Sequence, residues 1–396
     1  MSGVITARVA VVGLGAFGSS ALWRLAARGV DAVGIDRYGV GHHLGSTHGA
    51  TRLFRIACQE HEGLTPIARA SLRLWAELGE RNGEEYVRQS GCLSTAAAHE
   101  APVAGTLAAA SAADVEVERL DAATLRSRFP QYGAIGDGTE GVWDPGAGIC
   151  YPEKNVRAHV AEARRLGARV LTDTRVTGVE LLEHGVRVRT STLTIEAEQV
   201  ILAAGAWNPK LLPGLPVRPL RMPLFWFRPR EGARHSYELE DFPAFIHQLP
   251  GERLLWGHGA ADGHGIKVGV DVDDDGFADT DADEVDRYIH PRNDAARLSS
   301  WVEEAFPELD PVPDKAIPCM ITASPDGQFL VGRPGADPRV LLASGDHGHG
   351  FKHAAGIGEL LAQLAVGEEP YCDASFLDPD RFEECAEAVA ALPRGA

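Results

Sequence analysis

One stretch near the beginning of the sequence constrains the fold more than any other. It runs from Arg8 to Asp36, RVAVVGLGAFGSSALWRLAARGVDAVGID, and places Gly13, Gly15 and Gly18 between a short apolar run and an amphipathic segment. A second apolar run then ends in Asp36. This order predicts a strand, a glycine turn, a helix and a second strand, which is how many α/β sheets begin.

The same stretch predicts a dinucleotide site. A phosphate would lie on the unsatisfied N–H groups at the start of the helix, and the carboxylate of Asp36 would lie within reach of a ribose hydroxyl. A GxGxxG pattern alone is weak, but here the strand, turn, helix and acidic residue follow one another in the expected order. We therefore prefer this interpretation to an ordinary glycine-containing connection in an α/β domain.

Composition narrows the class of protein. The 396 residues suffice for two domains of ordinary size, and 44% are hydrophobic and 24% charged, with no apolar run long enough to cross a bilayer. A formal net charge of -18 disfavours nucleic acid and anionic membranes as partners. The first residues lack a secretory signal pattern and the six cysteines form no CxxC pair. We therefore expect a cytoplasmic protein with reduced thiols.

The order of the expected elements indicates two discontinuous domains. Residues 1–85, 150–216 and 315–396 predict an α/β, Rossmann-like domain that binds the cofactor. Residues 86–149 and 217–314 predict a substrate domain of α+β type, because LFWFRP, PAFIHQL and RLLWGHG are strand-like runs separated by turns. This second domain should contain a mixed or antiparallel sheet. Residues 316–332, AIPCMITASPDGQFLVG, predict a hairpin-like pair of strands with its turn at SPDG.

Three glycine-containing loops are candidates for ligand binding. RYGVGHHLGSTHGATRLFRIACQE, which follows Asp36, is too long for a plain connection. The turn from Ala203 to Trp207 is a second place where backbone can approach a cofactor. VLLASGDHGHGFKHAAGIGE repeats the order of strand, loop and helix, so it can supply a second set of N–H groups.

Two patterns partly match metal sites. DVDDDGFADTDADE at 271–284 contains DxDxDG, but Ala282 occupies the position where a calcium loop needs its bidentate Glu, so we expect a solvated acidic loop. His347, His349 and His353 include an HxH pair without a suitably spaced Cys or carboxylate. We therefore predict that the chain binds no metal.

Several motifs together match one known family. They are GLGAFG, STHGATRLFR at 46–55, GVWDPGAGICYPEKNVRA at 141–158, VILAAGAW, GIKVG at 265–269, PCMITASPDGQFLVG at 318–332 and SGDHGHGFKHAAGIGE at 344–359. The chain resembles the monomeric sarcosine oxidase and N-methyltryptophan oxidase group of the D-amino-acid-oxidase-like flavoproteins. The resemblance implies a monomeric enzyme that uses FAD to oxidise a secondary amine of an amino acid to an imine, with O2 reduced to H2O2.

The resemblance also assigns roles beside the flavin. Cys319 matches the cysteine that is joined through sulfur to the flavin ring, although from the residue alone a buried structural thiol is the simpler interpretation. His48 and Arg52 match positions beside the flavin, where a cation can stabilise the electron-rich reduced ring. His349 matches a histidine near the flavin, and Lys267 matches the lysine whose charge favours electron transfer to oxygen. The cofactor-contacting residues expected in all are Gly13, Gly15, Ala16, Phe17, Gly18, Asp36, Arg37, Ser46, His48, Arg52, Val176, Ala204, Gly205, Trp207, Cys319, Gly348, Gly350 and Lys352.

Substrate binding follows the same resemblance. Arg55 and Lys352 match the pair that holds the substrate carboxylate, which suits a two-pronged guanidinium and a mobile ammonium group. Trp256 and Asp271 stand where relatives acting on small N-methyl amino acids have a tyrosine and a histidine. This difference puts sarcosine itself in doubt and leaves a cyclic imino acid such as pipecolate or proline, or a biosynthetic intermediate, as the alternative substrate. Two other classes also stay open, an NAD-dependent dehydrogenase and a non-catalytic flavin-binding or electron-transfer subunit.

Overall fold

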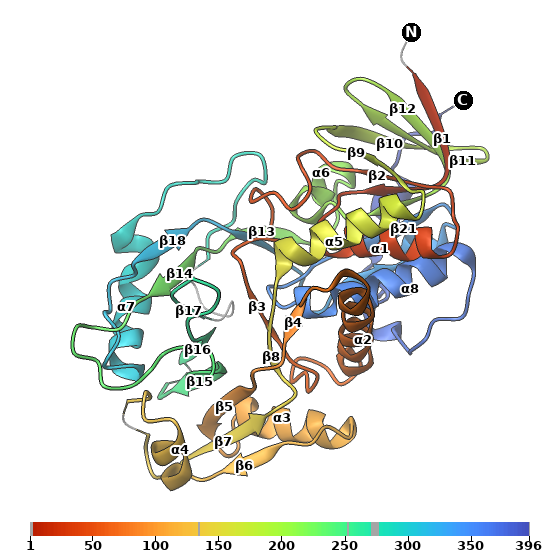
Figure 1. Cartoon of the computed structure of the whole chain (residues 1–396). Coiled ribbons are helices and arrows are strands. Elements are labelled where there is room, and N and C mark those ends of the chain that lie inside the picture. The colour runs from red at the N-terminus through yellow and green to blue at the C-terminus, as the bar shows by residue number, and fades with distance from the viewer. Residues whose placement is uncertain (1–2, 134, 252, 271–276, 396) are drawn as a thin grey trace.

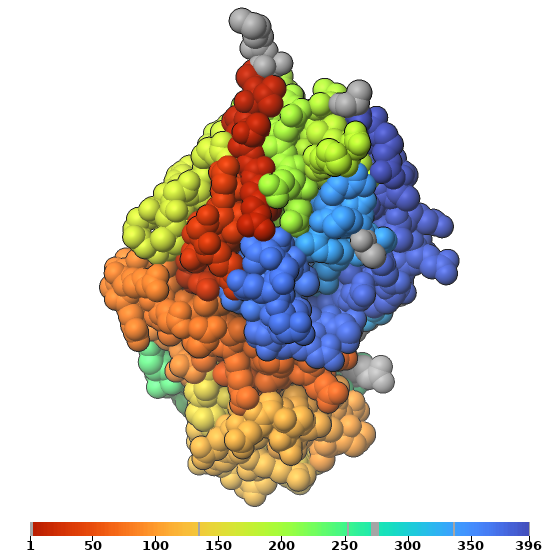
Figure 2. Space-filling view, turned by 90° about the vertical axis from the view of Figure 1, so that its right-hand side faces the viewer, coloured from red at the N-terminus to blue at the C-terminus, as the bar shows by residue number. Residues whose placement is uncertain are grey.

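The computed structural model describes residues 3–133, 135–251, 253–270 and 277–395, and its strands form two large sheets with two small ones between them (Figure 1). The space-filling view places β1 (Val4–Val12), in red, at one end of the molecule. The segment around α3 (Ala101–Ala112), in light orange, lies at the opposite end (Figure 2).

The first large sheet is organised around β1. Val9 and Val11 belong to one core and Ala10 and Val12 to the other, as expected for a strand buried on both faces. β2 (Ala32–Ile35) and β12 (Thr194–Leu202) pair in parallel with β1 on either side. The order is β10-β11-β12-β1-β2-β9, with β21 beside β12 and β20 beside β21. The other strands are β9 (Arg169–Leu171), β10 (Val176–Leu182), β11 (Gly185–Thr190), β20 (Leu330–Gly332) and β21 (Val340–Ser344).

Helices cover both faces of this sheet. On one face, α1 (Ala16–Ala27) packs between α5 (Pro152–Arg165) and α8 (Ala354–Val366), and α2 (Leu64–Asn82) packs on α8. On the other face lie α6 (Asn208–Leu211) and α9 (Glu383–Ala390). Helices on both faces of a mostly parallel sheet confirm the predicted Rossmann-like architecture.

The second large sheet has the order β18-β14-β17-β16-β15-β5-β7-β6 and is mixed, because β15 and β5 are parallel while the other pairs are antiparallel. Its core is rich in phenylalanine and lies under α4 (Ala122–Arg128) and α7 (Ala296–Ala305). The strands are β5 (Cys92–Ala97), β6 (Glu118–Leu120), β7 (Thr139–Asp144), β14 (Leu224–Phe227), β15 (Ala244–Leu249), β16 (Arg253–His258), β17 (Ile266–Val270) and β18 (Lys315–Ile317).

Two small sheets lie between the large ones. One has the order β3-β8-β4, formed by β3 (Arg52–Phe54), β8 (Gly148–Cys150) and β4 (Val87–Arg88). The other pairs β13 (Arg218–Arg221) with β19 (Met320–Ala323). Arg52 and Cys319, both expected beside the cofactor, lie in or next to these connecting strands.

The predicted hairpin at 316–332 is wrong. β19 pairs with β13, β20 pairs with β21, and β18 pairs with β14 in the second sheet. SPDG therefore connects strands of different sheets. The physical reason is that each short strand satisfies its backbone groups on the strand that lies beside it in space, which local sequence does not encode.

Two further findings concern the chain as a whole. Within the described ranges, no helix combines the length and apolarity needed to cross a membrane. All six cysteines are described and are free thiols, five of them buried. Free thiols agree with the expectation from cysteine spacing.

Candidate functional site

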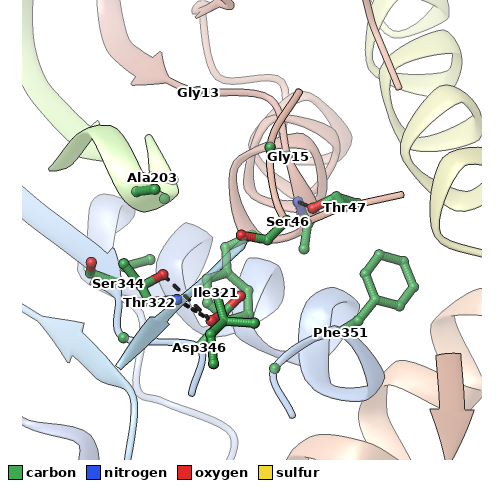
Figure 3. A pocket seen from close by; sticks show the side chains of 18 of the residues that line it. Gly13, Gly15, Ser46, Thr47, Ala203, Ile321, Thr322, Ser344, Asp346 and Phe351 are labelled. Carbon is green, nitrogen blue, oxygen red and sulfur yellow. Dashed lines mark hydrogen bonds between the residues drawn. The ribbon is translucent and has the colours of Figure 1, made fainter. Parts of the chain in front are cut away.

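A cavity of about 490 Å³ lies between the two large sheets. The glycine turn after β1, the loop after β2, the turn after β12 and the glycine–histidine loop after β21 surround it, and side chains from β15 and β16 close its far end. Figure 3 shows Gly13 and Gly15 on one side of this cavity, with Ala203 and Asp346 on neighbouring loops. Loops at the carboxyl ends of parallel strands are where α/β sheets bind ligands.

The glycine turn is as tight as a dinucleotide site requires. A Cβ on Gly13 would lie 2.5 Å from the carbonyl oxygen of Ala203, and a Cβ on Gly18 would lie 1.8 Å from that of Gly13. A Cβ on Gly15 would meet only Thr47 Oγ1, at 3.4 Å, so the cavity approaches the backbone there. The N-cap residue of α1, Gly15, makes no side-chain capping bond, and the Ala16 N–H donates to Thr47 Oγ1 at 3.3 Å. The other N–H groups at the start of α1 can therefore bind a pyrophosphate.

Asp36 is fixed against this turn. Its Oδ2 accepts a hydrogen bond of 2.7 Å from the Leu14 N–H, and its Oδ1 accepts one of 2.8 Å from the Tyr38 N–H. The carboxylate is 5% exposed and lines the cavity. Asp36 therefore stands where a ribose hydroxyl can reach it.

The glycine–histidine loop is tied to β19 through one carboxylate. Asp346 Oδ1 accepts a hydrogen bond of 3.0 Å from the Thr322 N–H, which Figure 3 shows as a dashed line. The His347 N–H in turn donates to the Thr322 carbonyl oxygen at 2.9 Å. These contacts hold Gly348 and Gly350 at the wall of the cavity.

Most of the predicted site residues line the cavity, and a few do not. Gly18, His48, Lys267 and Cys319 are not among its lining residues, and Asp271 lies outside the described part of the chain. The predicted residues that line it are Gly13, Gly15, Ala16, Phe17, Asp36, Arg37, Ser46, Arg52, Arg55, Val176, Ala204, Gly205, Trp207, Trp256, Gly348, His349, Gly350 and Lys352.

Arg55 and Lys352 both line the cavity, and a third lining residue joins them. Glu60 Oε1 accepts from Arg55 Nη2 at 2.7 Å and from Lys352 Nζ at 3.0 Å. Burial alone would raise the pKa of Glu60, but the charges of Arg55 and Lys352 hold that pKa well below its usual value. Two cations and one anion leave one positive charge in excess, which suits a single carboxylate ligand. Sequence reasoning missed Glu60.

Lys267 is buried beside the cavity. Its Nζ donates to the carbonyl oxygens of Gly49, at 3.0 Å, and Thr51, at 2.8 Å, and lies 5.2 Å from the centre of the Trp226 ring. Burial lowers the pKa of Lys267 well below its ordinary value, and the neighbouring charge of Arg52 adds to the effect. The positive charge of Lys267 is therefore lost more easily than that of an exposed lysine.

Three further residues expected beside the flavin, Arg52, His48 and Cys319, differ in charge. Arg52 donates to the carbonyl oxygens of Thr51 and Ser46, at 2.8 Å each, and no carboxylate in the described ranges pairs with it. Burial, with the charges of Arg52 and Lys267, lowers the pKa of His48 to about 3, so His48 is neutral near pH 7. The cation at this point is therefore Arg52. Cys319 Sγ lies 3.8 Å from the carbonyl oxygen of Ser46, and burial raises the pKa of its thiol.

His349 is also neutral. Its Nε2 lies 3.0 Å from the Gly327 carbonyl oxygen, and since a carbonyl only accepts, Nε2 carries the hydrogen. Burial, with the charge of Lys352, lowers the pKa of His349 to about 4. Among the described residues, no three His, Cys, Asp or Glu side chains converge on a possible metal site.

One face of the second sheet forms an apolar wall of the cavity. Ile246 lies opposite Trp256 in the β15–β16 pair, and Leu254 is two residues before Trp256, so all three point to the same face. They line the cavity, whereas Phe245 on the other face belongs to the core. Trp256 Nε1 donates to the Val270 carbonyl oxygen at 2.8 Å, which fixes the indole ring.

Comparison with known proteins identifies the family. The family model of FAD dependent oxidoreductases matches residues 8–364. Monomeric sarcosine oxidase from Streptomyces avermitilis is 32% identical over 377 residues, which cover 94% of this chain and 97% of the relative. N-methyl-L-tryptophan oxidase from Salmonella agona is 30% identical over 380 residues, which cover 94% and 98%.

Solved structures share the fold at lower identity. NikD, an unusual amino acid oxidase essential for nikkomycin biosynthesis, has a TM-score of 0.79 at 24% identity, with 95% of this chain and 98% of that chain covered. L-proline dehydrogenase from P. horikoshii has a TM-score of 0.81 at 21% identity, with 96% and 98% covered. The family model and the curated relatives define a flavin-dependent oxidoreductase. The chain belongs to the FAD dependent oxidoreductase family, as the resemblance in its motifs indicated.

Proposed function

We propose that the protein oxidises a secondary amine of an amino acid to an imine, with FAD as cofactor and O2 as electron acceptor. The observation that carries the proposal is that Arg55 and Lys352 meet at Glu60 in the wall of the same cavity that the dinucleotide-type turn lines. The names of the curated relatives, sarcosine oxidase and N-methyl-L-tryptophan oxidase, support an N-methyl amino acid as substrate. Because the matched family is defined by FAD, it disfavours the nicotinamide alternative.

The residues around the cavity suit this reaction. When bound, FAD takes a hydride equivalent from the carbon beside the amine nitrogen and passes two electrons to O2, giving H2O2 with two protons. Arg55 and Lys352 hold the substrate carboxylate and thereby orient the reacting carbon. The neutral His349 adds no charge that would repel or protonate the amine. Arg52 supplies a positive charge at the cavity wall, and Lys267 supplies another behind it.

We also infer that Cys319 forms a thioether to the flavin and that Lys267 promotes the reaction with O2. Cys319 lies beside Ser46, which lines the cavity, and its motif is in register with the family. The free thiols favour a reducing, cytoplasmic location. A relative named monomeric sarcosine oxidase supports a monomer.

Anaerobic mixing with a panel of N-methyl, cyclic and D-amino acids tests the proposal. Loss of flavin absorbance identifies the substrates, and admission of air should restore the absorbance with release of peroxide. Arg55→Met and Lys352→Met should abolish bleaching at substrate concentrations that saturate the wild type, while keeping the wild-type ratio of flavin to protein. A flavoprotein that no compound in this panel bleaches would overturn the proposal and favour a flavin-binding subunit.

A second substrate class is favoured by the apolar wall. Ile246, Leu254 and Trp256 offer carbon surface rather than hydrogen-bonding groups to the part of the substrate opposite its carboxylate. This arrangement suits a cyclic imino acid or an amine with a large apolar side chain better than sarcosine. Faster bleaching by pipecolate or N-methyltryptophan than by sarcosine would establish this class.

A further inference from the structure

An acidic segment that follows β17 in the chain packs against the cofactor side of the molecule. Residues 277–290, here called the strap, precede α7 (Figure 1). The strap is fixed along β13: the Arg221 N–H donates to the Ala278 carbonyl oxygen at 2.9 Å, and the Thr280 N–H donates to that of Pro219 at 3.0 Å. The acidic residues of the strap are exposed, which agrees with the solvated acidic loop expected from the sequence, but these backbone bonds also hold the segment against another strand.

Apolar contacts hold the strap as well. Ala282 and Val285 are 4% and 8% exposed and form one cluster with Ala206 and Met320. Ala206 belongs to the turn after β12, and Met320 directly follows Cys319. The strap thus packs on two segments that surround the cofactor cavity. Burying small apolar side chains of this kind stabilises the contact.

Asp283 is the residue through which the strap reaches the cavity. Its Oδ1 accepts from Trp207 Nε1 at 2.8 Å and from Arg37, and its Oδ2 lies 3.3 Å from Arg175 Nη2 and 3.2 Å from Lys210 Nζ. All four partners line the cavity. They lie at the end marked by Asp36, where a dinucleotide places its ribose and base. One carboxylate thus organises three cations and an indole.

We propose that Asp283 is a positioning residue of the cofactor site, which fixes Arg37 and Trp207 so that the strap closes the ribose end of the cavity over bound FAD. Three cations around one carboxylate form a network, and such networks hold their geometry better than isolated surface pairs. Without Asp283, Arg37 and Arg175 lose this carboxylate partner and the Trp207 indole loses its acceptor, whereas Lys210 keeps its pair with Asp281 at 2.7 Å. This inference rests on FAD binding, but not on the identity of the amine.

The strap offers a matched control in Asp279. This residue pairs with Arg218 at 2.9 Å, and both side chains are 68% exposed. Arg218 does not line the cavity. Asp279→Asn therefore removes the same charge from the same segment without touching a residue of the cavity wall.

The experiment compares purified wild type with Asp283→Asn, Asp283→Glu and Asp279→Asn. Two quantities are measured, the ratio of flavin to protein and the hydrogen exchange of peptides covering 277–290 and 205–211. We expect Asp283→Asn to hold less than half the wild-type flavin and to exchange roughly fivefold faster in both peptides, which corresponds to the loss of one charge-assisted contact. Asp279→Asn should match the wild type, and Asp283→Glu should recover part of the flavin.

Two results would overturn the proposal. One is a ratio of flavin to protein in Asp283→Asn that equals that of the wild type, whether or not the hydrogen exchange of the variant changes. The other result is measured on the wild type and so does not depend on the folding of a variant. Salt should screen the charges of this network, so hydrogen exchange of the strap that is unchanged in 1 M salt would contradict the proposal. Neither readout involves amine turnover, so failure here is distinct from failure of the proposed oxidase activity.

Discussion

Arg55 donates from Nη2 to Oε1 of Glu60 across 2.7 Å, at the end of the cavity where the substrate carboxylate should bind. The same oxygen accepts from Lys352. The carboxylate of Glu60 therefore already accepts hydrogen bonds from both cations to which we assign the substrate carboxylate. A substrate carboxylate must share these two cations with Glu60 or displace it from them.

Glu60→Gln should tighten binding of a carboxylate ligand. The amide cannot compete as an anion, so we expect the Kd of a non-oxidisable acid such as cyclohexanecarboxylate to fall by roughly tenfold. Titration followed by the flavin spectrum measures this. Thermal stability should decrease in the same variant, because two buried cations lose their counter-ion. Glu62→Gln, at an exposed neighbouring position, is the control, and weaker ligand binding in Glu60→Gln would contradict the competition.

Lys267→Met should slow reoxidation by O2 by roughly a hundredfold and slow reduction by the amine less than about threefold, since the charge is needed only where oxygen becomes anionic. Burial lowers the pKa of Lys267, so the charged form is lost as pH rises through that lowered pKa. Wild-type reoxidation should therefore slow with rising pH, and that of the variant should not. Lys315→Met, on the same Trp226 ring, is the control. Equal slowing of both half-reactions would contradict the assignment.

Gly269→Ala should change substrate preference by moving a neighbouring side chain. A Cβ at this position would lie 2.4 Å from Cζ2 of Trp256, so the indole must leave its place. We expect KM for a bulky or cyclic amine to rise by about tenfold and KM for sarcosine to change little. Gly178→Ala, where a Cβ meets nothing within 4 Å, is the control. An equal rise for both substrates would mean that Trp256 does not contact the part that distinguishes them.

His159 should make the fold sensitive to acid. Trp75 Nε1 donates to its Nε2 at 2.8 Å, and burial lowers its pKa to about 3, against about 6.5 in the unfolded chain. Between these values the unfolded state binds a proton that the folded state does not, so stability falls as pH falls from 6.5 toward 3. At pH 5 the loss from this residue is about 2 kcal/mol.

Urea unfolding at pH 7 and pH 5 measures that loss. His159→Gln should be less stable at pH 7 but should lose less on going to pH 5 than the wild type. His184→Gln, whose side chain is 91% exposed, should behave as the wild type. An unchanged difference between the two pH values in His159→Gln would assign the acid sensitivity to other groups.

Cys319→Ala should release its flavin when the protein is denatured, whereas the wild type should retain it. Wild-type flavin should remain with the acid-precipitated chain because a thioether survives denaturation, and the flavin of the variant should stay in the supernatant. Absorbance of the two fractions gives the result. Cys372→Ala, at a half-buried position away from the cavity, is the control. Release of flavin from the wild type would exclude the covalent link.

The stretch from Arg8 to Asp36 shows which structural features the local sequence determines. The apolar run that starts at Val9 and the glycines that follow determine a strand, a tight turn and a helix, because these depend on residues that are close in the chain. The family motifs extended this to Arg55 and Lys352, and the structure brings both to one cavity. Glu60 had only a weak signal, an acidic residue five positions after Arg55.

Strand pairing and charge pairing were decided by the tertiary structure. SPDG predicts a hairpin locally, yet β19 and β20 lie in different sheets, since a strand pairs with whichever neighbour the fold places beside it. Nothing in the acidic context of Asp283 predicts a partner, yet this exposed residue pairs with Arg37 from 246 positions away in the chain. The sequence by itself determined the dinucleotide turn and the family, because both are patterns of neighbouring residues. Only the tertiary structure decided which charges meet, because Coulomb attraction depends on distance in space and not on order in the chain.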